Sequence, residues 1–148
     1  MIYKTSVKTK IGWVSAFEED KKIFRVRFGK VKRKNTTKIL NKFKKKLLNF
    51  FNKKTSNIII KSEIKGNLIQ KKVWNELKNI KKGETKTYGE IAKKFNLSPR
   101  HVGKICGQNK LLLLVPCHRV VRSDGELGGF TSTGGIKLKK KLLEFEKL

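Results

Sequence analysis

The sequence is poor in cysteine, histidine and acidic residues, and these shortages limit the kinds of site that it can build. Its two cysteines, Cys106 and Cys117, lack the Cys-x-x-Cys spacing of a zinc site, and the chain has only two histidines. We therefore expect no bound metal ion. A disulfide between the two thiols stays an open alternative, although so sparse a pair is typical of proteins from a reducing compartment.

Long apolar runs are also missing. No segment approaches the ~20 residues that a helix needs to span a bilayer, and the start of the chain, Met1-Ile2-Tyr3-Lys4, lacks the apolar core of a signal peptide. These absences predict a cytoplasmic protein without a membrane partner. The 148 residues suit one domain or two small ones, and no internal repeat or linker rich in proline and serine divides them.

Negative charge is scarce as well. The chain has 11 Asp and Glu against 38 Lys and Arg, which gives a formal net charge of +27. One interpretation is a solubilising surface or a lysine-biased genome. The other is a polyanionic partner, with nucleic acid as the first candidate, because a basic surface is the electrostatic footprint of such a partner.

The N-terminal part predicts a small sheet and one helix. Residues 1–29 have the short apolar patches of strands, and within 23–28 apolar side chains alternate with arginines. Residues 36–53 repeat apolar side chains at helical spacing with lysines between them, and 57–60 predict one more short strand. No catalytic residue types cluster here, so we expect a scaffold domain over residues 1–64.

The C-terminal part, residues 65–148, predicts a mostly helical domain, so that the fold class is α/β of the α+β kind. Thr87 and Glu90 have the spacing of a capping box at a helix start. Ser98-Pro99 begins a second helix, with a hydroxyl cap and proline at the first position. Two short helices joined by a tight turn indicate a helix-turn-helix.

Two more helices are predicted beside this motif. The first places Ile69 and Trp74 on one apolar stripe, and the last, over about 135–147, buries Ile136 together with Leu142.

The second helix of the motif contains Gly103 and Gly107, which lie four residues apart and hence on one face. Each costs about 1 kcal/mol relative to alanine in a helix interior, so this face needs the close approach of another group. A neighbouring helix and the minor groove of DNA, about 6 Å wide, are the two alternatives.

Residues 111–121 join an apolar run to Cys117 and His118. A thiol next to an imidazole predicts nucleophilic chemistry, with His118 as the base. Apolar surroundings raise the pKa of a thiol, and consecutive strand residues point to opposite faces, so the pair needs a turn or a bridging water. The alternative is that Cys117 is a small buried side chain, as we expect for Cys106.

The same stretch resembles a known family. Pro116-Cys117-His118-Arg119-Val120 is similar to the active-site signature of the methylated-DNA–protein-cysteine methyltransferases, the O6-alkylguanine-DNA alkyltransferases. Further motifs of that family lie in the same order over about residues 68–148: Val73-Trp74, Thr87-Tyr88-Gly89-Glu90-Ile91-Ala92, Ser98-Pro99-Arg100, Val102-Gly103, Asn109, and Leu142-Leu143 with Glu146. The N-terminal part is similar to the family's variable N-terminal domain.

For the reactive site, the resemblance implies that Cys117 takes an alkyl group from O6 of guanine, and more weakly from O4 of thymine. It implies that His118 acts as a base through a water and is held by Glu146, and that Asn109 is a hinge. Because an S-alkyl thioether has no good leaving group, the thiol is consumed. The protein is then a suicide methyltransferase for DNA repair by direct reversal, a monomer without a cofactor.

For the partner, the resemblance implies double-stranded DNA containing O6-alkylguanine, from which the target base is flipped. Tyr88 helps to rotate the nucleotide, and Arg100 fills the space that it leaves. The helix with Gly103 and Lys104 lies in the minor groove, and Ser123 also contacts DNA.

The resemblance also places Val120, Thr131 and Ser132 around the pocket for the flipped base. Two other functions stay open. One is a non-enzymatic lesion sensor on the same fold, against which the presence of Cys117 argues. The other is a helix-turn-helix regulator in which the Cys-His pair is incidental.

Overall fold

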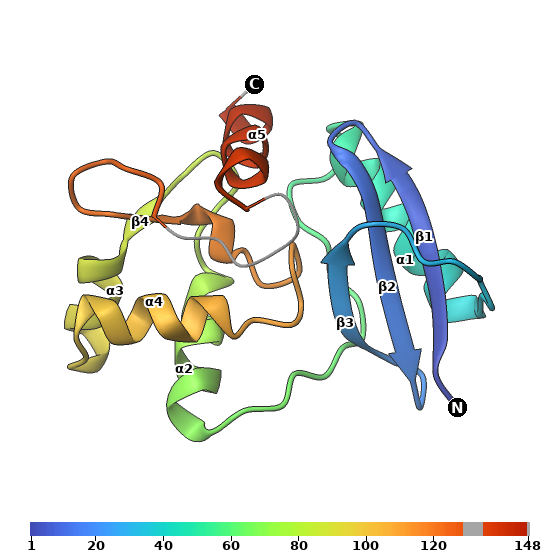
Figure 1. Cartoon of the computed structure of the whole chain (residues 1–148), viewed down its shortest axis with the longest axis horizontal. Helices are drawn as coiled ribbons and strands as arrows, with labels where there is room; N and C mark the ends of the chain where they lie inside the picture. The colour runs from blue at the N-terminus through green and yellow to red at the C-terminus, as the bar shows by residue number, and fades with distance from the viewer. Residues whose placement is uncertain (129–134, 148) are drawn as a thin grey trace. The chain divides into compact units, whose positions relative to one another are not determined.

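The computed structural model of the chain describes residues 1–128 and 135–147 (Figure 1). The chain divides into two compact units: the first contains Met1–Ile64 and Lys110–Leu114, and the second contains Lys65–Asn109 and Val115–Leu148. A three-stranded sheet and a helix make up the first unit, and the second is mostly helical. The predicted α+β fold class is therefore confirmed. Residues 110–114, expected with the C-terminal domain, group with the first unit instead.

Three antiparallel strands form the sheet of the first unit, in the order β1 (Tyr3–Thr9), β2 (Gly12–Glu19) and β3 (Lys22–Phe28). Between β2 and β3, Asp20 and Lys21 have φ values of 52° and 63°. Positive φ at both central residues is typical of the type I′ turn, whose backbone twist matches that of the two strands in a hairpin with a two-residue loop. The acidic turn therefore connects two neighbouring strands directly.

The core of the first unit lies between the sheet and α1 (Lys38–Phe51), which covers one face of it (Figure 1). Side chains alternate along a strand, so Val14, Ala16 and Val26 point to this face, and all three are at most 1 % exposed. The apolar stripe of α1 packs against them, and its buried residues are Leu40, Phe43, Leu47, Phe50 and Phe51. The helix predicted over 36–53 is confirmed, slightly shorter at both ends.

Residues 57–60 do not form the predicted strand. The free edge of β3 is paired by two other segments. Ile23 exchanges backbone hydrogen bonds with residues 61–63, and Val26 exchanges them with residues 110–112. Because each strand edge accepts one partner at a given position, this edge of β3 is already occupied there. Within 57–60, Ile58 is buried, whereas Ile59 is 68 % exposed.

The second unit is assembled around α2 (Leu68–Leu77). Trp74 of α2 is buried, and its Nε1–H donates a hydrogen bond of 3.0 Å to the backbone oxygen of Ile105 in α4 (Pro99–Gly107). This bond satisfies the one polar atom of a large core side chain. Ile69, expected on the same stripe, is 36 % exposed and lies at the margin of the core.

α3 (Tyr88–Phe95) and α4 form the predicted helix-turn-helix. Thr87 and Glu90 complete a capping box at the start of α3, and the Ser98 side chain accepts a hydrogen bond at the start of α4. Asn96 ends α3 in the left-handed region, at φ 55°. The start signals of both helices are therefore the ones that the sequence predicts.

Four further elements complete the second unit, namely β4 (Lys86–Thr87), η1 (Cys117–Arg119), β5 (Val120–Val121) and α5 (Gly135–Lys147). β4 and β5 pair in parallel. α5 has the predicted range, but the expected burial of Ile136 is wrong, because this side chain is 55 % exposed. Over residues 1–128 and 135–147, no helix combines the length and the apolar character that crossing a membrane requires.

The left-handed residue that ends α3 gives a stability test. We expect Asn96→Ala to lower the free energy of unfolding by about 1 kcal/mol, because alanine is strained at positive φ. Asn96→Gly should leave stability nearly unchanged, because glycine adopts this conformation freely. Urea titrations of the two variants measure the difference, and equal stabilities would contradict the strain.

Candidate functional site

The stretch before the Cys-His pair turns rather than extends. Leu113 has φ 71°, and the backbone N–H of Cys117 donates to the oxygen of Val115 at 2.8 Å. Cys117, His118 and Arg119 then form the single 3₁₀ turn η1. With three residues per turn, consecutive side chains point about 120° apart, in contrast to the opposite directions of a strand. The turn that the Cys-His pair requires is therefore present.

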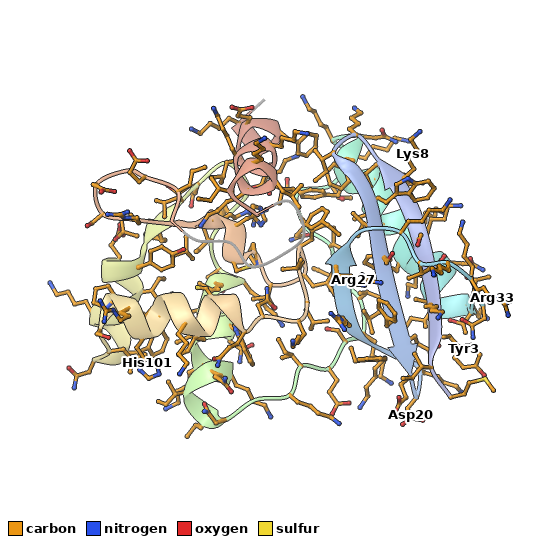
Figure 2. The ribbon with its side chains drawn as sticks, viewed as in Figure 1. Tyr3, Lys8, Asp20, Arg27, Arg33 and His101 are labelled. Atoms are coloured by element: carbon orange, nitrogen blue, oxygen red, sulfur yellow. The ribbon has the colours of Figure 1, made fainter. Side chains whose placement is uncertain are left out.

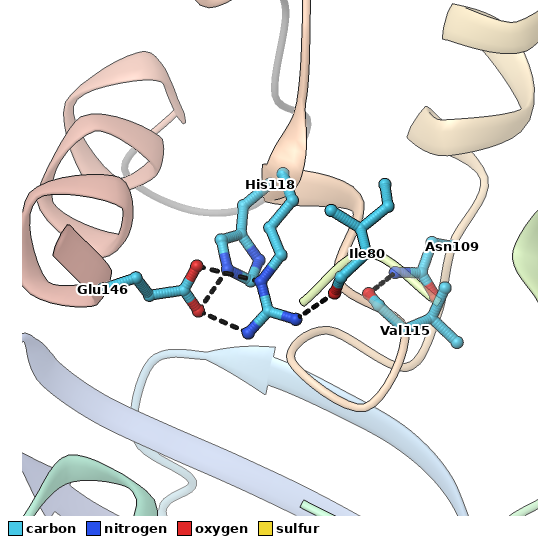
Figure 3. A network of polar contacts seen from close by, with 6 residues as sticks. Ile80, Asn109, Val115, His118 and Glu146 are labelled. Atoms are coloured by element: carbon cyan, nitrogen blue, oxygen red, sulfur yellow. Dashed lines mark hydrogen bonds and ion pairs between the residues drawn. The ribbon is translucent and has the colours of Figure 1, made fainter. Parts of the chain in front are cut away.

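Cys117 is buried, with 3 % of its surface exposed, and it is held by Asn109. The Nδ2 of Asn109 donates to Sγ of Cys117 at 3.3 Å and to the backbone oxygen of Val115 at 2.9 Å, and the second bond is drawn in Figure 3. Burial raises the pKa of the Cys117 thiol, whereas the hydrogen bond from Asn109 and the charge of Lys139 lower it. The amide thus favours the thiolate inside an apolar setting that otherwise disfavours it.

Cys106 is the second buried thiol, in α4. Burial raises its pKa to about 12. Both cysteines are free, so the alternative of a disulfide between them is wrong for this structure.

His118 and Glu146 form a buried pair. Nε2 of His118 lies 2.9 Å from Oε2 of Glu146, and their side chains are 2 % and 1 % exposed. Burial lowers the pKa of His118, with the carboxylate opposing it, so the ring is neutral at pH 7. Burial alone would raise the pKa of Glu146, but hydrogen bonds from His118 and Arg119 outweigh it and lower the pKa to about 2. An ionised Glu146 accepts the Nε2–H, which leaves the Nδ1 lone pair as the proton acceptor.

Arg119 belongs to this site although the sequence predicted no role for it. Its Nε and Nη2 donate to the two oxygens of Glu146 at 2.9 and 2.7 Å, and Nη1 donates to the backbone oxygen of Ile80 at 2.7 Å (Figure 3). This two-pronged contact is the strongest form of a carboxylate pair. Arg119 therefore fixes the carboxylate that in turn orients His118.

Lys139 is the other site residue that the sequence did not single out. It is fully buried, and its Nζ donates to Oη of Tyr88 at 3.2 Å and lies 5.5 Å from the centre of that ring. Burial lowers the pKa of Lys139, while the two nearby thiols Cys117 and Cys106 raise it. Burial also raises the pKa of Tyr88 to about 12. A cation and a phenol thus share the surroundings of the reactive thiol.

A signal for Lys139 does exist in the sequence. It lies three residues before Leu142 and seven before Glu146, which are positions on one face of a helix. A lysine on the apolar stripe of a helix that also carries a predicted site residue points into the site.

A pocket of about 610 Å³ lies beside the helix-turn-helix and contains four of the five residues that were predicted to contact DNA. Tyr88, Arg100, Gly103 and Ser123 all line it. Lys104 is exposed on α4 but does not line the pocket. The structure therefore brings residues from α3, α4 and the loop after β5 to one concave surface.

Two glycines shape this surface around Tyr88. At Gly128, with φ 74°, a Cβ would lie 2.9 Å from the ring of Tyr88, so only glycine fits. At Gly103 a Cβ would meet the same ring at 3.9 Å, an ordinary contact. Tyr88 is the first residue of α3, so a neighbouring helix does approach Gly103, through this side chain. The approach of a minor groove to the same face stays a prediction.

The predicted base pocket is described only in part. Val120 is fully buried in β5, whereas Thr131 and Ser132 lie outside the described residues.

The comparisons with known proteins assign this half of the chain. The family model of the 6-O-methylguanine DNA methyltransferase DNA-binding domain matches residues 68–148. The chain belongs to this family. The match covers α2, the helix-turn-helix and η1. It therefore includes the thiol of Cys117 and the imidazole of His118.

Curated relatives of this methyltransferase family match over the same part. A methylated-DNA–protein-cysteine methyltransferase of Saccharomyces cerevisiae is 49 % identical over 84 residues, which is 55 % of this chain and 44 % of the relative. One from Methanocaldococcus vulcanius is 48 % identical over 90 residues, 61 % of this chain and 54 % of the relative. The chain thus spans about half the length of the curated relatives that it matches.

Solved structures extend the similarity to the N-terminal half. The O6-methylguanine methyltransferase of Mycobacterium tuberculosis superposes with a TM-score of 0.83 at 27 % identity, covering 99 % of this chain and 93 % of that one. The M. tuberculosis OGT in complex with DNA gives a TM-score of 0.86 at 28 % identity, with 97 % and 92 % covered.

The buried carboxylate of this family member gives a pH-dependent stability prediction. Its pKa is about 2 when folded, against 4.5 ordinarily, so its stabilisation is present above pH 4.5 and is lost as the pH falls towards 2. We expect Glu146→Gln to lower the free energy of unfolding by roughly 3 kcal/mol at neutral pH, because Arg119 loses its partner. The deficit should shrink below about pH 4.5.

Urea titrations between neutral and acidic pH measure this deficit. Glu144→Gln is the matched control, because Glu144 is exposed on the same helix and should change stability by less than about 0.5 kcal/mol. A deficit of Glu146→Gln that stays constant down to acidic pH would show that its carboxylate is not held ionised by these partners.

Proposed function

We propose that this protein repairs double-stranded DNA by direct reversal, taking the alkyl group of O6-alkylguanine, and more weakly of O4-alkylthymine, onto Cys117. The observation that carries the proposal is the buried thiol of Cys117, held by Asn109 and next in sequence to a neutral imidazole that an ionised Glu146 orients. This is the constellation of an activated nucleophile, a base and an orienting acid.

The proposed transfer is a displacement at the alkyl carbon. The Cys117 proton passes through a water to Nδ1 of His118, and the sulfur then forms a bond to the alkyl carbon while the bond from that carbon to guanine O6 breaks. The resulting imidazolium is stabilised by Glu146, whose charge Arg119 maintains. The departing guanine takes up a proton, and the hydrogen-bonded Tyr88 and Lys139 are the donors placed nearby.

The chemistry makes the protein a reagent that acts once. A thioester is open to hydrolysis, but an S-alkyl thioether offers no comparable leaving group, so Cys117 is not regenerated. No redox cofactor or metal ion takes part in the proposed steps, which use only the side chains of this chain.

DNA binding in this proposal uses the helix-turn-helix. α4 enters the minor groove, Tyr88 helps to turn the target nucleotide out, and Arg100 fills the space in the stack. All three features line one pocket with Gly103 and Ser123. Flipping is required because O6 of a stacked guanine cannot reach a thiol that is 3 % exposed.

The proposed reaction also indicates a cellular compartment for the protein. Cys117 must stay reduced before it reacts, which suits the cytoplasm. We also expect a monomer, which size-exclusion chromatography tests.

The alkyl transfer is tested by intact mass after incubation with methylated duplex DNA. The protein should gain a net CH2 in a single step, because S–H becomes S–CH3. Cys117→Ala should bind DNA without any gain in mass, whereas Cys106→Ala, which removes the other buried thiol, should still gain one CH2. A wild-type protein that binds but gains nothing would leave the lesion-sensor or regulator function in its place.

The flipping role of Arg100 is tested by comparing two substrates. Arg100→Ala should slow transfer from duplex DNA by about tenfold or more, a loss of at least ~1.4 kcal/mol in the transition state, and leave transfer from the free alkylated base unchanged. Lys104→Ala is the control, since it removes the same charge from the same helix and should weaken binding without slowing transfer at saturating DNA. Equal effects of Arg100→Ala on both substrates would remove its role in flipping.

A further inference from the structure

The face of the sheet that points away from α1 combines aromatic rings with cations. The pairing register places Lys4 and Arg25 on either side of Phe17, and Lys8 beside Trp13. These residues alternate along the strands with the buried ones, so they lie on the opposite side of the sheet from α1. The basic aromatic face comprises these five residues and three further cations, Arg27, Lys30 and Lys34.

Four of these cations are stacked on the two rings. The guanidinium carbons of Arg25 and Arg27 lie 5.9 and 5.4 Å from the centre of Phe17. The ammonium nitrogens of Lys30 and Lys34 lie 4.7 and 6.0 Å from the centre of Trp13. Such stacking restricts long side chains before any partner binds, which lowers the entropy lost on binding.

The segment that supplies Lys30 and Lys34 is itself tied to the sheet. It crosses this face between β3 and α1 (Figure 1). Oγ of Ser15 donates to the backbone oxygen of Gly29 at 2.6 Å, and the backbone N–H of Val31 donates to Oγ of Ser6 at 2.8 Å. The two lysines are therefore presented from a fixed backbone.

The positive charge of this face is not compensated. Residues 1–64 contain 19 Lys and Arg but only four Asp and Glu. Three of the acids lie at the end of β2 and in its turn, and Figure 2 shows Asp20 there, at the opposite end of the sheet from Lys8. Within residues 1–128 and 135–147, none of Arg25, Arg27, Lys30 and Lys34 forms an ion pair with a carboxylate.

We propose that the basic aromatic face is a second DNA-binding surface, which contacts the phosphate backbone of the duplex without reading its sequence. The rings already carry cations, so they are not free platforms for stacked bases, and the exposed groups suit phosphates. The choice of duplex DNA as the polyanion rests on the proposed function. The face belongs wholly to the first unit, whereas the pocket at α4 belongs to the second.

The salt dependence of binding to long, undamaged duplex DNA tests this surface. Replacing Arg25, Arg27, Lys30 and Lys34 with glutamine should reduce the slope of log K against log salt by about 3 to 4, because each phosphate contact contributes about 0.9. The matched control replaces four exposed lysines of α1, Lys38, Lys42, Lys44 and Lys45, with glutamine. It removes the same charge and should change the slope by less than about 1.

Equal slopes for the two variants would overturn the proposal, because general charge would then explain the binding. Alkyl transfer from the free alkylated base should be unchanged in both, which shows that they fold. If the wild-type protein fails to transfer, the proposed function fails, and the comparison of slopes still tests the face.

Tryptophan fluorescence gives a second readout, because the chain has two tryptophans and Trp74 is buried. Phosphates that draw Lys30 and Lys34 away from Trp13 should change its emission. The change should be lost in Trp13→Phe and kept in the α1 control variant. An unchanged response in Trp13→Phe would overturn the proposal. The proposal would also be overturned if the variant with four glutamines lost binding to RNA or to vesicles of anionic lipid but kept binding to duplex DNA.

Discussion

The buried carboxylate of Glu146 is the interaction on which the candidate site depends. A single ionised group, 1 % exposed in its side chain, accepts hydrogen bonds from His118 and Arg119 and is thereby stable in a place where burial alone would neutralise it. Its charge determines which nitrogen of His118 carries the proton. In the proposed reaction, the imidazole acts as a base only as long as this ion network is intact.

The same network joins separate parts of the second unit. Glu146 comes from α5, Arg119 from η1, and the backbone oxygen of Ile80 from the segment after α2. Because the guanidinium has donors in a rigid fork, it can bind all of these acceptors only in one arrangement. The position of the Cys117 thiol is therefore specified by the ion pair and hydrogen bonds of Arg119 in the same turn, as well as by apolar packing. Lysine in place of Arg119 could not provide the same fork.

Much of this could be predicted from local signals. The caps at Thr87 and Ser98 are encoded within a few residues, so the helix-turn-helix was visible in the sequence. Arg119 and Lys139 were not identified because their partners lie 27 and 51 residues away, at Glu146 and Tyr88. The helical spacing places Lys139 on the apolar stripe of α5, but its hydrogen bond to Tyr88 becomes visible only in the tertiary structure.

The strand expected at 57–60 shows the same limit for the sheet. Alternation and β-branched residues predict that a segment can pair, but not whether the edge is still free. In this chain residues 61–63 and 110–112 occupy the edge of β3. The assignment of residues 110–114 to the first unit follows from that pairing, which no local pattern records.

Burial of the thiol also has a consequence for how long the protein lasts. A reagent that is used once must not be spent on the wrong electrophile. Cys117 is almost closed to solvent, and burial raises its pKa, so before DNA binds it exists mainly as a shielded thiol. Peroxides and small alkylating agents react with exposed thiolates. Burial makes Cys117 a poor nucleophile in the free protein. For the proposed activity, the same burial keeps the thiol unreacted until a damaged base is bound.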